Sequence, residues 1–272
     1  MGGQVVLTTG ANSGIGLATA IELARRGYDS VGSVRSTAKG RAVTRAAAEA
    51  GVRVRTVTLD VTDPEAGARV VHKLKPYALV NNAGYSAAGA IEDVTDEEAR
   101  MVLETMVLAP MRLARHALST MLELGGGRIV NISSIYGRTT TPLSGWYQGS
   151  KHALEALSDA LRMEVAASGV KVILVQPGGF NTGIWDQTSG EFGKHAGSRF
   201  AGAYRRAETG FRLTQPLMGA PETVARVIAG AIESKRPRAR YLVGLDAQAL
   251  AFWDSVLPTE IKDRLKRLPL GL

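Results

Sequence analysis

Apolar runs of strand length alternate with longer helix-like segments along this chain, and no other feature of the sequence restricts its fold as strongly. Several runs are near-continuous in Val, Ile and Leu, which is typical of strands covered on both faces. A repeated strand–helix–strand order implies a parallel sheet with helices on both sides. We therefore predict an α/β fold, a single doubly wound domain over residues 1–272. The seven expected strands are Gln4–Thr9, Asp29–Val34, Val52–Leu59, Tyr77–Asn81, Arg128–Ser133, Val170–Gln176 and Arg240–Val243.

Six segments between these strands have helical periodicity, and capping residues support them. Asp63 before Pro64, for example, combines an N-cap residue with a proline at the first helical position. One long segment, Asn181–Gly219, is rich in glycine and scattered aromatic residues, and we expect a lid or substrate-binding segment there. The expected helices are Gly14–Arg26, Ala38–Ala50, Pro64–Leu74, Asp96–Leu124, Gln148–Ser168 and Pro221–Ser234.

The composition excludes several classes of protein. The chain has no cysteine and four histidines, so neither a disulfide scaffold nor a metal site is expected. Its net charge is 33 − 25 = +8, but the basic residues are dispersed, so we expect no nucleic-acid partner. No apolar run reaches the roughly 18 residues of a membrane span. The first residues lack the regions of a secretory signal, and a cytoplasmic protein is expected.

The last segment, Asp246–Leu272, combines apolar residues with Lys262, Arg264, Lys266 and Arg267. A basic amphipathic helix can lie on a membrane surface. Packing against the domain or against a second subunit is the favoured interpretation, and membrane association is not expected.

A glycine-rich turn follows the first strand. Glycines at positions 10, 14 and 16 let the backbone turn sharply and approach a diphosphate, while the next helix offers its free N-terminal amides to the anion. Placed between a first strand and a first helix, this turn predicts a dinucleotide site. The expected cofactor contacts are Gly10, Asn12, Ser13, Gly14, Ile15 and Gly16.

The end of the second strand bears on the choice of dinucleotide. An acidic residue there would bind the ribose 2′-hydroxyl of NAD, whereas arginine suits the 2′-phosphate of NADP. This chain has Arg35 and Ser36 at that place and no acid. We therefore predict that NADP(H) is preferred, with NAD(H) use possible because an exposed arginine can also simply begin a helix.

Ser134, Tyr147 and Lys151 form the expected catalytic group. Tyr147 and Lys151 are four residues apart, which places them on one helical face. A nearby ammonium favours the tyrosinate, so the pKa of the phenol should fall from about 10. The Tyr147 phenol then serves as a general acid or base. The Ser134 hydroxyl, at a neighbouring strand end, can hydrogen-bond a carbonyl oxygen.

Taken together, these motifs resemble the short-chain dehydrogenase/reductase superfamily over nearly the whole chain, and the retinol- and 17β-hydroxysteroid-dehydrogenase-like branch in particular. The resemblance implies a Rossmann-like fold and makes Lys151 both a pKa modifier and a ligand of the nicotinamide ribose. The matching motifs are Thr9-Gly10-x-x-x-Gly14-x-Gly16, Leu59-Asp60-Val61, Asn81-Asn82-Ala83-Gly84, Ser134, Tyr147-x-x-x-Lys151 and Pro177-Gly178. The further cofactor contacts it implies are Asp60, Val61, Asn82, Ala83, Gly84, Tyr147, Lys151, Pro177, Gly178 and Thr182.

One position departs from the family pattern. Members of the family usually carry an asparagine on the long fourth helix, which helps to hold a water that links the lysine to solvent. This chain has Met106 there, and a thioether is only a weak acceptor. Three accounts stay open: other groups such as Thr105 rebuild the proton route, the enzyme tolerates a slower relay, or the scaffold has lost activity or changed chemistry.

Two functions follow from the sequence. The first is an NADP(H)-dependent oxidoreductase that interconverts a ketone or aldehyde and the alcohol on an apolar, fairly bulky substrate. Aromatic residues near the motifs favour such a substrate, and His195 is a further candidate for substrate contact. The alternative is a catalytically impaired nucleotide-sensing protein. The resemblance also implies a homodimer or homotetramer that pairs through the fourth and fifth helices. The aromatic candidates are Tyr85, Tyr136, Trp146 and Trp185.

Overall fold

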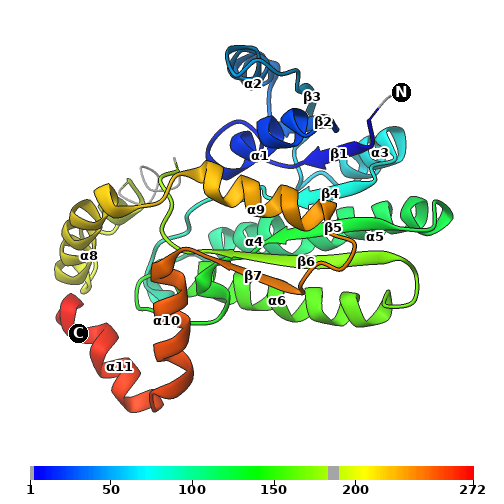
Figure 1. The fold of residues 1–272 in the computed structure, drawn as a ribbon. Helices are drawn as coiled ribbons and strands as arrows, with labels where there is room; N and C mark the ends of the chain where they lie inside the picture. Colours follow the sequence, from blue (N-terminus) through cyan, green and yellow to red (C-terminus); the bar gives the residue numbers. More distant parts are fainter. Residues whose placement is uncertain (1–2, 183–189) are drawn as a thin grey trace.

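A seven-stranded parallel sheet forms the centre of the protein, in a computed structural model that describes residues 3–182 and 190–272 (Figure 1). The strand order is β3-β2-β1-β4-β5-β6-β7, and every neighbouring pair is parallel. The predicted doubly wound, Rossmann-like sheet is confirmed. The strands are β1 (Val5–Thr8), β2 (Asp29–Val34), β3 (Arg55–Thr58), β4 (Ala78–Asn81), β5 (Gly127–Ile132), β6 (Val170–Pro177) and β7 (Arg240–Val243).

Helices cover both faces of the sheet, and successive residues of β1 show why. Val6 packs in a core with residues of α1 and α9, while Leu7 packs in a second core with residues of α3 and α5. Side chains alternate across a strand, so a strand buried on both faces must be apolar throughout. The helices that flank the sheet are α1 (Gly14–Arg25), α2 (Thr37–Glu49), α3 (Pro64–Leu74), α4 (Asp96–Leu103), α5 (Ala109–Glu123), α6 (Gly145–Glu164) and α9 (Pro221–Glu233).

The single helix expected over residues 96–124 is interrupted. Between α4 and α5 lies a π-helical turn, η2 (Glu104–Leu108), and Pro110 follows it. Proline lacks an N–H and cannot complete the regular hydrogen-bond pattern, so a wider turn before it relieves the conflict. Thr105, Met106 and Val107 in this turn are all buried.

Three peripheral helices were not among the expected elements: α8 (Ala201–Thr214), α10 (Leu245–Val256) and α11 (Thr259–Arg267). Helix α8 lies within the segment predicted to be a lid, of which residues 183–189 are outside the described part. Helices α10 and α11 form an arm at the C-terminal end of the chain (Figure 1), hereafter the C-terminal arm (residues 245–272).

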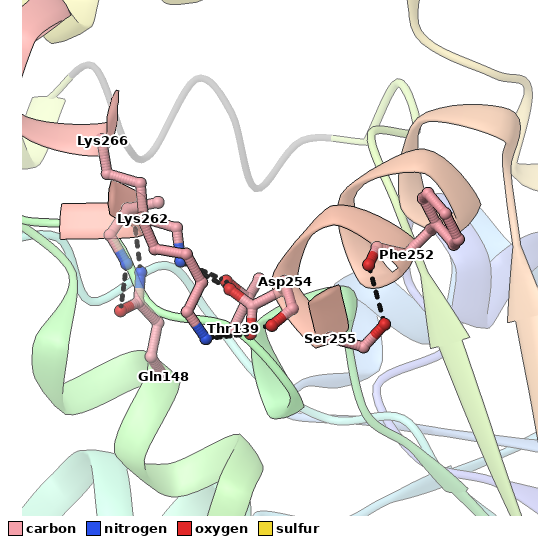
Figure 2. A network of polar contacts seen from close by, with 8 residues as sticks. Thr139, Gln148, Phe252, Asp254, Ser255, Lys262 and Lys266 are labelled. Atoms are coloured by element: carbon pink, nitrogen blue, oxygen red, sulfur yellow. Dashed lines mark hydrogen bonds and ion pairs between the residues drawn. The ribbon is translucent and has the colours of Figure 1, made fainter. Parts of the chain in front are cut away.

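The C-terminal arm is tied to the rest of the chain by charged groups. Asp254 accepts hydrogen bonds from Thr139 Oγ1 (2.5 Å) and from Lys266 Nζ (2.7 Å), and Lys262 lies 3.5 Å from its other oxygen (Figure 2). Arg206 of α8 donates to the backbone oxygen of Leu270. The tail thus contacts the domain, which is one of the two arrangements expected for it. No helix in the described residues is long and apolar enough to cross a bilayer.

Strand order reverses between β1 and β4, since the chain runs from β1 outward to β3 and then returns to β4 on the other side. In open parallel sheets, ligands bind beyond the carboxyl ends of the strands at such a switch point. The glycine-rich turn follows β1, and the Asn82–Gly84 segment follows β4. The fold thus brings two of the predicted cofactor motifs to the same edge.

Candidate active site

The glycine-rich turn is tightly packed against the end of β4. Gly10 and Gly14 have φ values of +65° and +52°, a region that L-residues with side chains rarely adopt. A Cβ at Gly16 would lie 2.4 Å from Gly10 O and from Asn82 Nδ2. These three glycines are therefore required by the geometry of the turn.

The start of α1 can accept an anion. Ser13 is its N-cap residue, but its side chain caps no backbone amide, whereas Ser36, Asp63 and Thr95 each cap their helices. Free N-terminal amides and the helix dipole favour a bound diphosphate. Because Asn12, Ser13, Gly14 and Ile15 all retain surface exposure, a dinucleotide phosphate group fits this turn.

A hydrogen-bond brace holds the turn in place. The buried Thr9 hydroxyl accepts from the backbone amides of Asn82 (2.9 Å) and Ala83 (3.0 Å). The Asn82 side chain donates to Thr9 O (2.9 Å) and Gly10 O (3.3 Å). The side chain of Asn82, expected along the cofactor, thus binds the turn itself. Sequence reasoning did not assign Thr9 this role, although its place in the Thr-Gly motif is the signal.

Arg35 and Asp60 lie at the far end of the same edge, after β2 and β3. Hydrogen bonds from the backbone and hydroxyl of Thr62 hold the pKa of Asp60 below its usual range, and the charge of Arg35 acts in the same direction. Arg35 is exposed, and its guanidinium makes no ion pair with another described residue. Ser36 caps α2 by accepting from Lys39 N. Val61 is buried next to Asp60. Arg35 is free to bind an anionic group.

Ser134, Tyr147 and Lys151 converge at the end of β5. Ser134 is the N-cap residue of the short helix η3 (Ile135–Gly137), and its hydroxyl lies near enough to the Tyr147 phenol to lower the pKa of that phenol. Lys151 Nζ lies 5.6 Å from the centre of the Tyr147 ring and donates to Ile132 O at 2.9 Å. Helix α6 starts at Gly145, so Tyr147 lies inside its first turn rather than just before it.

The predicted fall in the Tyr147 pKa is wrong for the protein chain alone. Burial raises the pKa of Tyr147 to about 12, although the nearby Ser134 hydroxyl acts in the opposite direction. Burial also lowers the pKa of Lys151 to about 8, while the charge of Glu155 raises it. Desolvation is thus the largest cause of both shifts. At neutral pH Tyr147 is a neutral proton donor and Lys151 is charged.

Met106 is enclosed beside these residues. It is 1% exposed, and its sulfur lies 3.5 Å from the hydroxyl of Ser150, the residue before Lys151. The same sulfur would lie 3.9 Å from a Cβ at Gly84. Thr105 is also buried. Met106 thus fills the space between the β4 end and α6 with an apolar side chain.

Loops after β6 and β4 complete the rim of the site. A Cβ at Gly14 would meet the Thr182 side chain at 3.0 Å, so Thr182 lies directly over the glycine-rich turn. Pro177 ends β6, and Gly178 N donates to Val243 O. The predicted residues Thr182, Pro177 and Gly178 therefore lie at the same sheet edge as the turn.

A polar cluster that sequence reasoning missed fixes the segment before α8. Tyr204 donates to Asp93 Oδ2 (2.7 Å) and accepts from Ala90 N (2.7 Å), and Ser198 also donates to Asp93. His195 stacks on the Tyr204 ring with centroids 5.2 Å apart. His195 is thus packed against protein, and the cluster joins the α8 segment to the β4–α4 loop. Trp185, an expected pocket residue, lies outside the described residues.

One edge of the sheet thus carries a helix end that can accept a phosphate, an exposed arginine, and a group of one tyrosine, one lysine and one serine. A bound nicotinamide dinucleotide fits this set, and a neutral phenol beside an ammonium can exchange a proton with a substrate oxygen. Fold and site thus define a dinucleotide-dependent oxidoreductase.

Comparison with known proteins agrees. Residues 4–191 match the model of the short chain dehydrogenase family, and the chain belongs to that family. It is 33% identical over 281 residues to retinol dehydrogenase 7 of Rattus norvegicus, covering 96% of this chain and 86% of the relative.

Solved structures of the family are also similar. A short-chain dehydrogenase from Streptomyces avermitilis has a TM-score of 0.79 and 30% identity, covering 97% of this chain and 94% of that one. An actinorhodin polyketide ketoreductase with NADPH has a TM-score of 0.75 and 29% identity, covering 88% and 96%. The protein is an NAD(P)-dependent oxidoreductase that acts on CH–OH or C=O groups.

Proposed function

We propose that the protein interconverts a ketone or aldehyde and the corresponding alcohol with NADP(H), using Tyr147 as general acid and base. The observation that carries this proposal is the convergence of the Ser134 hydroxyl and the Tyr147 phenol, close enough for Ser134 to lower the pKa of Tyr147, with the Lys151 amine 5.6 Å from the centre of the same ring. Three polar side chains from two elements lie together beyond the carboxyl end of β5, the strand next to β4.

The chain's own residues have distinct roles in this reaction. When bound, the nicotinamide supplies or accepts a hydride. Tyr147 gives its phenolic proton to the carbonyl oxygen during reduction. The Ser134 oxygen accepts from Tyr136 N at 3.1 Å, which orients the hydroxyl, and Ser134 donates its hydrogen to the substrate oxygen when a substrate is bound. Lys151, held by Ile132 O, keeps a positive charge near the phenol and stabilises the tyrosinate that remains.

Arg35 supports NADP(H) over NAD(H). It is exposed at the end of β2 and has no ion-pair partner among the described residues, so it can hold a phosphate. The polyketide ketoreductase that resembles this chain was solved with NADPH. NAD(H) lacks the phosphate and would lose this interaction.

An apolar, bulky substrate is supported by the residues around the site. Tyr136 packs edge-on against Tyr147 at 6.5 Å, and burial raises the pKa of Tyr136 and of Tyr85. The lid segment 181–219 contributes Phe192 and Tyr204 to an apolar cluster with Leu143. A relative is named for retinol, an apolar alcohol. We propose residues 181–219 as the substrate-binding segment of a single domain.

Tyr147→Phe tests the function directly. The variant lacks only the hydroxyl, so NADPH oxidation with a panel of apolar ketones should fall by about 10²–10⁴-fold. NADPH binding, measured by fluorescence titration, should persist. Tyr241→Phe, on β7, is the matched control and should retain activity. Wild-type protein that binds NADPH but reduces nothing in a broad panel would support the nucleotide-sensing alternative, which Met106 motivates. Turnover that survives in Tyr147→Phe would remove Tyr147 as the acid.

Pairing of subunits through α4–α5 and α6 is also proposed. Large apolar side chains are exposed by 42–65% on both parts: Met101 on α4 and Leu108 on η2, and Leu157 and Met163 on α6. Such side chains on neighbouring helices suit a homodimer or homotetramer. Light scattering of the wild type and of Leu108→Glu measures the mass directly, and a monomeric wild type would reject the proposal.

A further inference from the structure

Helix α6 carries a third titratable side chain in line with the catalytic pair. Tyr147, Lys151 and Glu155 follow one another at intervals of four residues, which places them on one helical face. Glu155 is 6% exposed. A buried carboxylate is costly unless it is paired, so its presence one turn from Lys151 needs an explanation.

Only one of the two carboxylate oxygens of Glu155 has a hydrogen-bond partner among the described residues. Its Oε2 accepts from Arg240 Nε of β7 at 2.9 Å. Its Oε1 is buried and accepts no hydrogen bond from the described residues, and the same is true of Ser133 Oγ. A Cβ at Gly137 would lie 3.3 Å from Oε1 and 2.6 Å from Ser133 Oγ. The free oxygen therefore faces the inner side of η3, next to the residue before Ser134.

Among the charged groups near α6, Glu155 has the largest electrostatic effect on Lys151. Glu155 is the charge that raises the pKa of Lys151 against the effect of burial. The remaining titratable groups on the elements packed against α6 are Tyr136 and Arg138 at η3, Lys171 on β6, Glu104 on η2, and Asp96, Glu97, Glu98 and Arg100 on α4.

Most of these groups are occupied elsewhere. Glu104 pairs with Arg112, and Arg100 pairs with Asp96 and Glu97 at the exposed end of α4. On α6 itself Asp159 binds Arg240 and Arg162, two turns from Lys151. Their effect at Lys151 is therefore weaker than that of Glu155.

We propose that Glu155 is a positioning residue of the active site, whose buried carboxylate, one turn along the same helical face, keeps the Lys151 ammonium charged beside Tyr147. Arg240, 33% exposed at its side chain, anchors one oxygen of Glu155 and connects the pair to the protein surface. The inference rests on the proposed function of Tyr147 and Lys151. The Glu155 carboxylate would then stabilise the charge of Lys151 in a site where Met106 supplies no polar group.

A purely structural role is the competing explanation. Arg240 joins Glu155 and Asp159 of α6 to β7, so the carboxylate could serve only to fasten the helix to the edge strand. That role predicts a loss of thermal stability in Glu155 variants and no change in the titration of Lys151. The two roles are therefore separable by pH dependence.

The experiment compares three variants with opposite expectations. Glu155→Gln keeps the shape and an acceptor for Arg240 but removes the charge, so the pH at which ketone reduction is half lost should fall by about one unit. Arg240→Gln removes the opposing charge and should raise that pH by about half a unit. Asp159→Asn, which shares Arg240 but lies farther away, is the control and should leave it unchanged. Glu155→Asp should restore most of the wild-type profile.

A second measurement does not depend on turnover. The ¹³Cε resonance of Lys151, identified by its loss in Lys151→Met, is titrated in the protein without cofactor. The same shifts should appear there, in the same directions. If Lys151 titrates alike in the wild type, Glu155→Gln and Arg240→Gln, the proposal is overturned. If Glu155→Gln does not fold, Arg240→Gln alone decides by the direction of its shift. An inactive wild type with these shifts present would reject the proposed function instead.

Discussion

The cofactor edge and the C-terminal arm of this protein are held together in opposite ways. Around the glycine-rich turn the backbone segments meet so closely that a single methyl group at Gly16 would lie 2.4 Å from a carbonyl oxygen. In the C-terminal arm, Ala247 is the buried residue of α10, and α11 has none. One region depends on close packing, and the other on a few polar contacts.

Helix α11 shows this difference most clearly, because its apolar side faces outward. Ile261 and Leu265 are 47% and 55% exposed, while Lys262 and Lys266 turn inward to Asp254 (Figure 2). Ion pairs with partial solvent access contribute little stability compared with a buried apolar face. We therefore expect the arm to open at a much lower free energy than the sheet.

The largest effect is expected for Gly16→Ala. Overpacking against backbone atoms should lower the free energy of unfolding by about 3 kcal/mol and weaken NADPH binding, because the turn must shift. Denaturant unfolding and fluorescence titration measure the two effects. Gly230→Ala is the control, since a Cβ there meets nothing within 4 Å and alanine favours a helix. An unchanged Gly16→Ala protein would contradict the close packing described for the turn.

Arg35→Ala should have the next largest effect. A charge-assisted contact with phosphate contributes about 2 kcal/mol, so NADPH affinity should fall by about 30-fold while NADH affinity stays nearly constant. Arg41→Ala, an exposed change on α2, should alter neither. Equal losses for both cofactors would show that Arg35 does not bind the 2′-phosphate.

The pH dependence of reduction provides the third test. The active form needs a neutral Tyr147, with a pKa of about 12, and a charged Lys151, with a pKa of about 8. As pH rises, Lys151 loses its proton first, so kcat/KM should fall about tenfold per unit above pH 8. A profile that is flat to pH 10 would show that the charge on Lys151 is not required.

Asp254→Ala should affect the C-terminal arm more than the sheet. It removes the acceptor of Thr139 and leaves Lys262 and Lys266 without their shared carboxylate. The expected loss is about 1 kcal/mol, with faster hydrogen exchange confined to residues 245–272. Asp263→Ala, an exposed change on α11, is the matched control. Exchange that accelerates equally in β1 would mean that arm and sheet open together.

The smallest effect is expected for Leu265→Ser. Its side chain is already largely in water, so the free energy of unfolding should change by less than about 0.5 kcal/mol. The same measurement on Leu113→Ala, at a buried position on α5, should show a loss of about 2–5 kcal/mol. Similar losses at the two leucines would remove the distinction between the regions.

The same contrast explains what the sequence could predict. The central strands are buried on both faces and have a strong apolar signal, and the two edge strands were also located. The edge strand β3 was expected at Val52–Leu59 but spans only Arg55–Thr58, because it is half exposed and its pattern is weak. Helices α10 and α11 were not expected. Most of their apolar residues are exposed in the structure, so the usual relation between an apolar face and a buried core does not hold there.

The site was predicted in part for a similar reason. Spacing along α6 brings Tyr147 near Lys151, and the structure has them together. Spacing gives no measure of solvation, so the direction of the Tyr147 pKa was wrong. The role of Thr9 in bracing the turn depends on contacts between residues more than 70 positions apart, which a single sequence does not show.

The π-helical turn at Glu104–Leu108 has a consequence for how this chain can vary in length. A π turn contains one residue more than the α turn it replaces, so deleting a residue there would restore a regular helix. That deletion would leave the part beyond it in nearly the same phase, whereas a deletion in the regular part of α5 would rotate everything beyond it by about 100°. Ala109, Leu113 and Ala117 would therefore stay against the sheet if the extra residue were lost from the turn. The wide turn is thus the one place described along α4–α5 where the helix can lose a residue and keep its buried face.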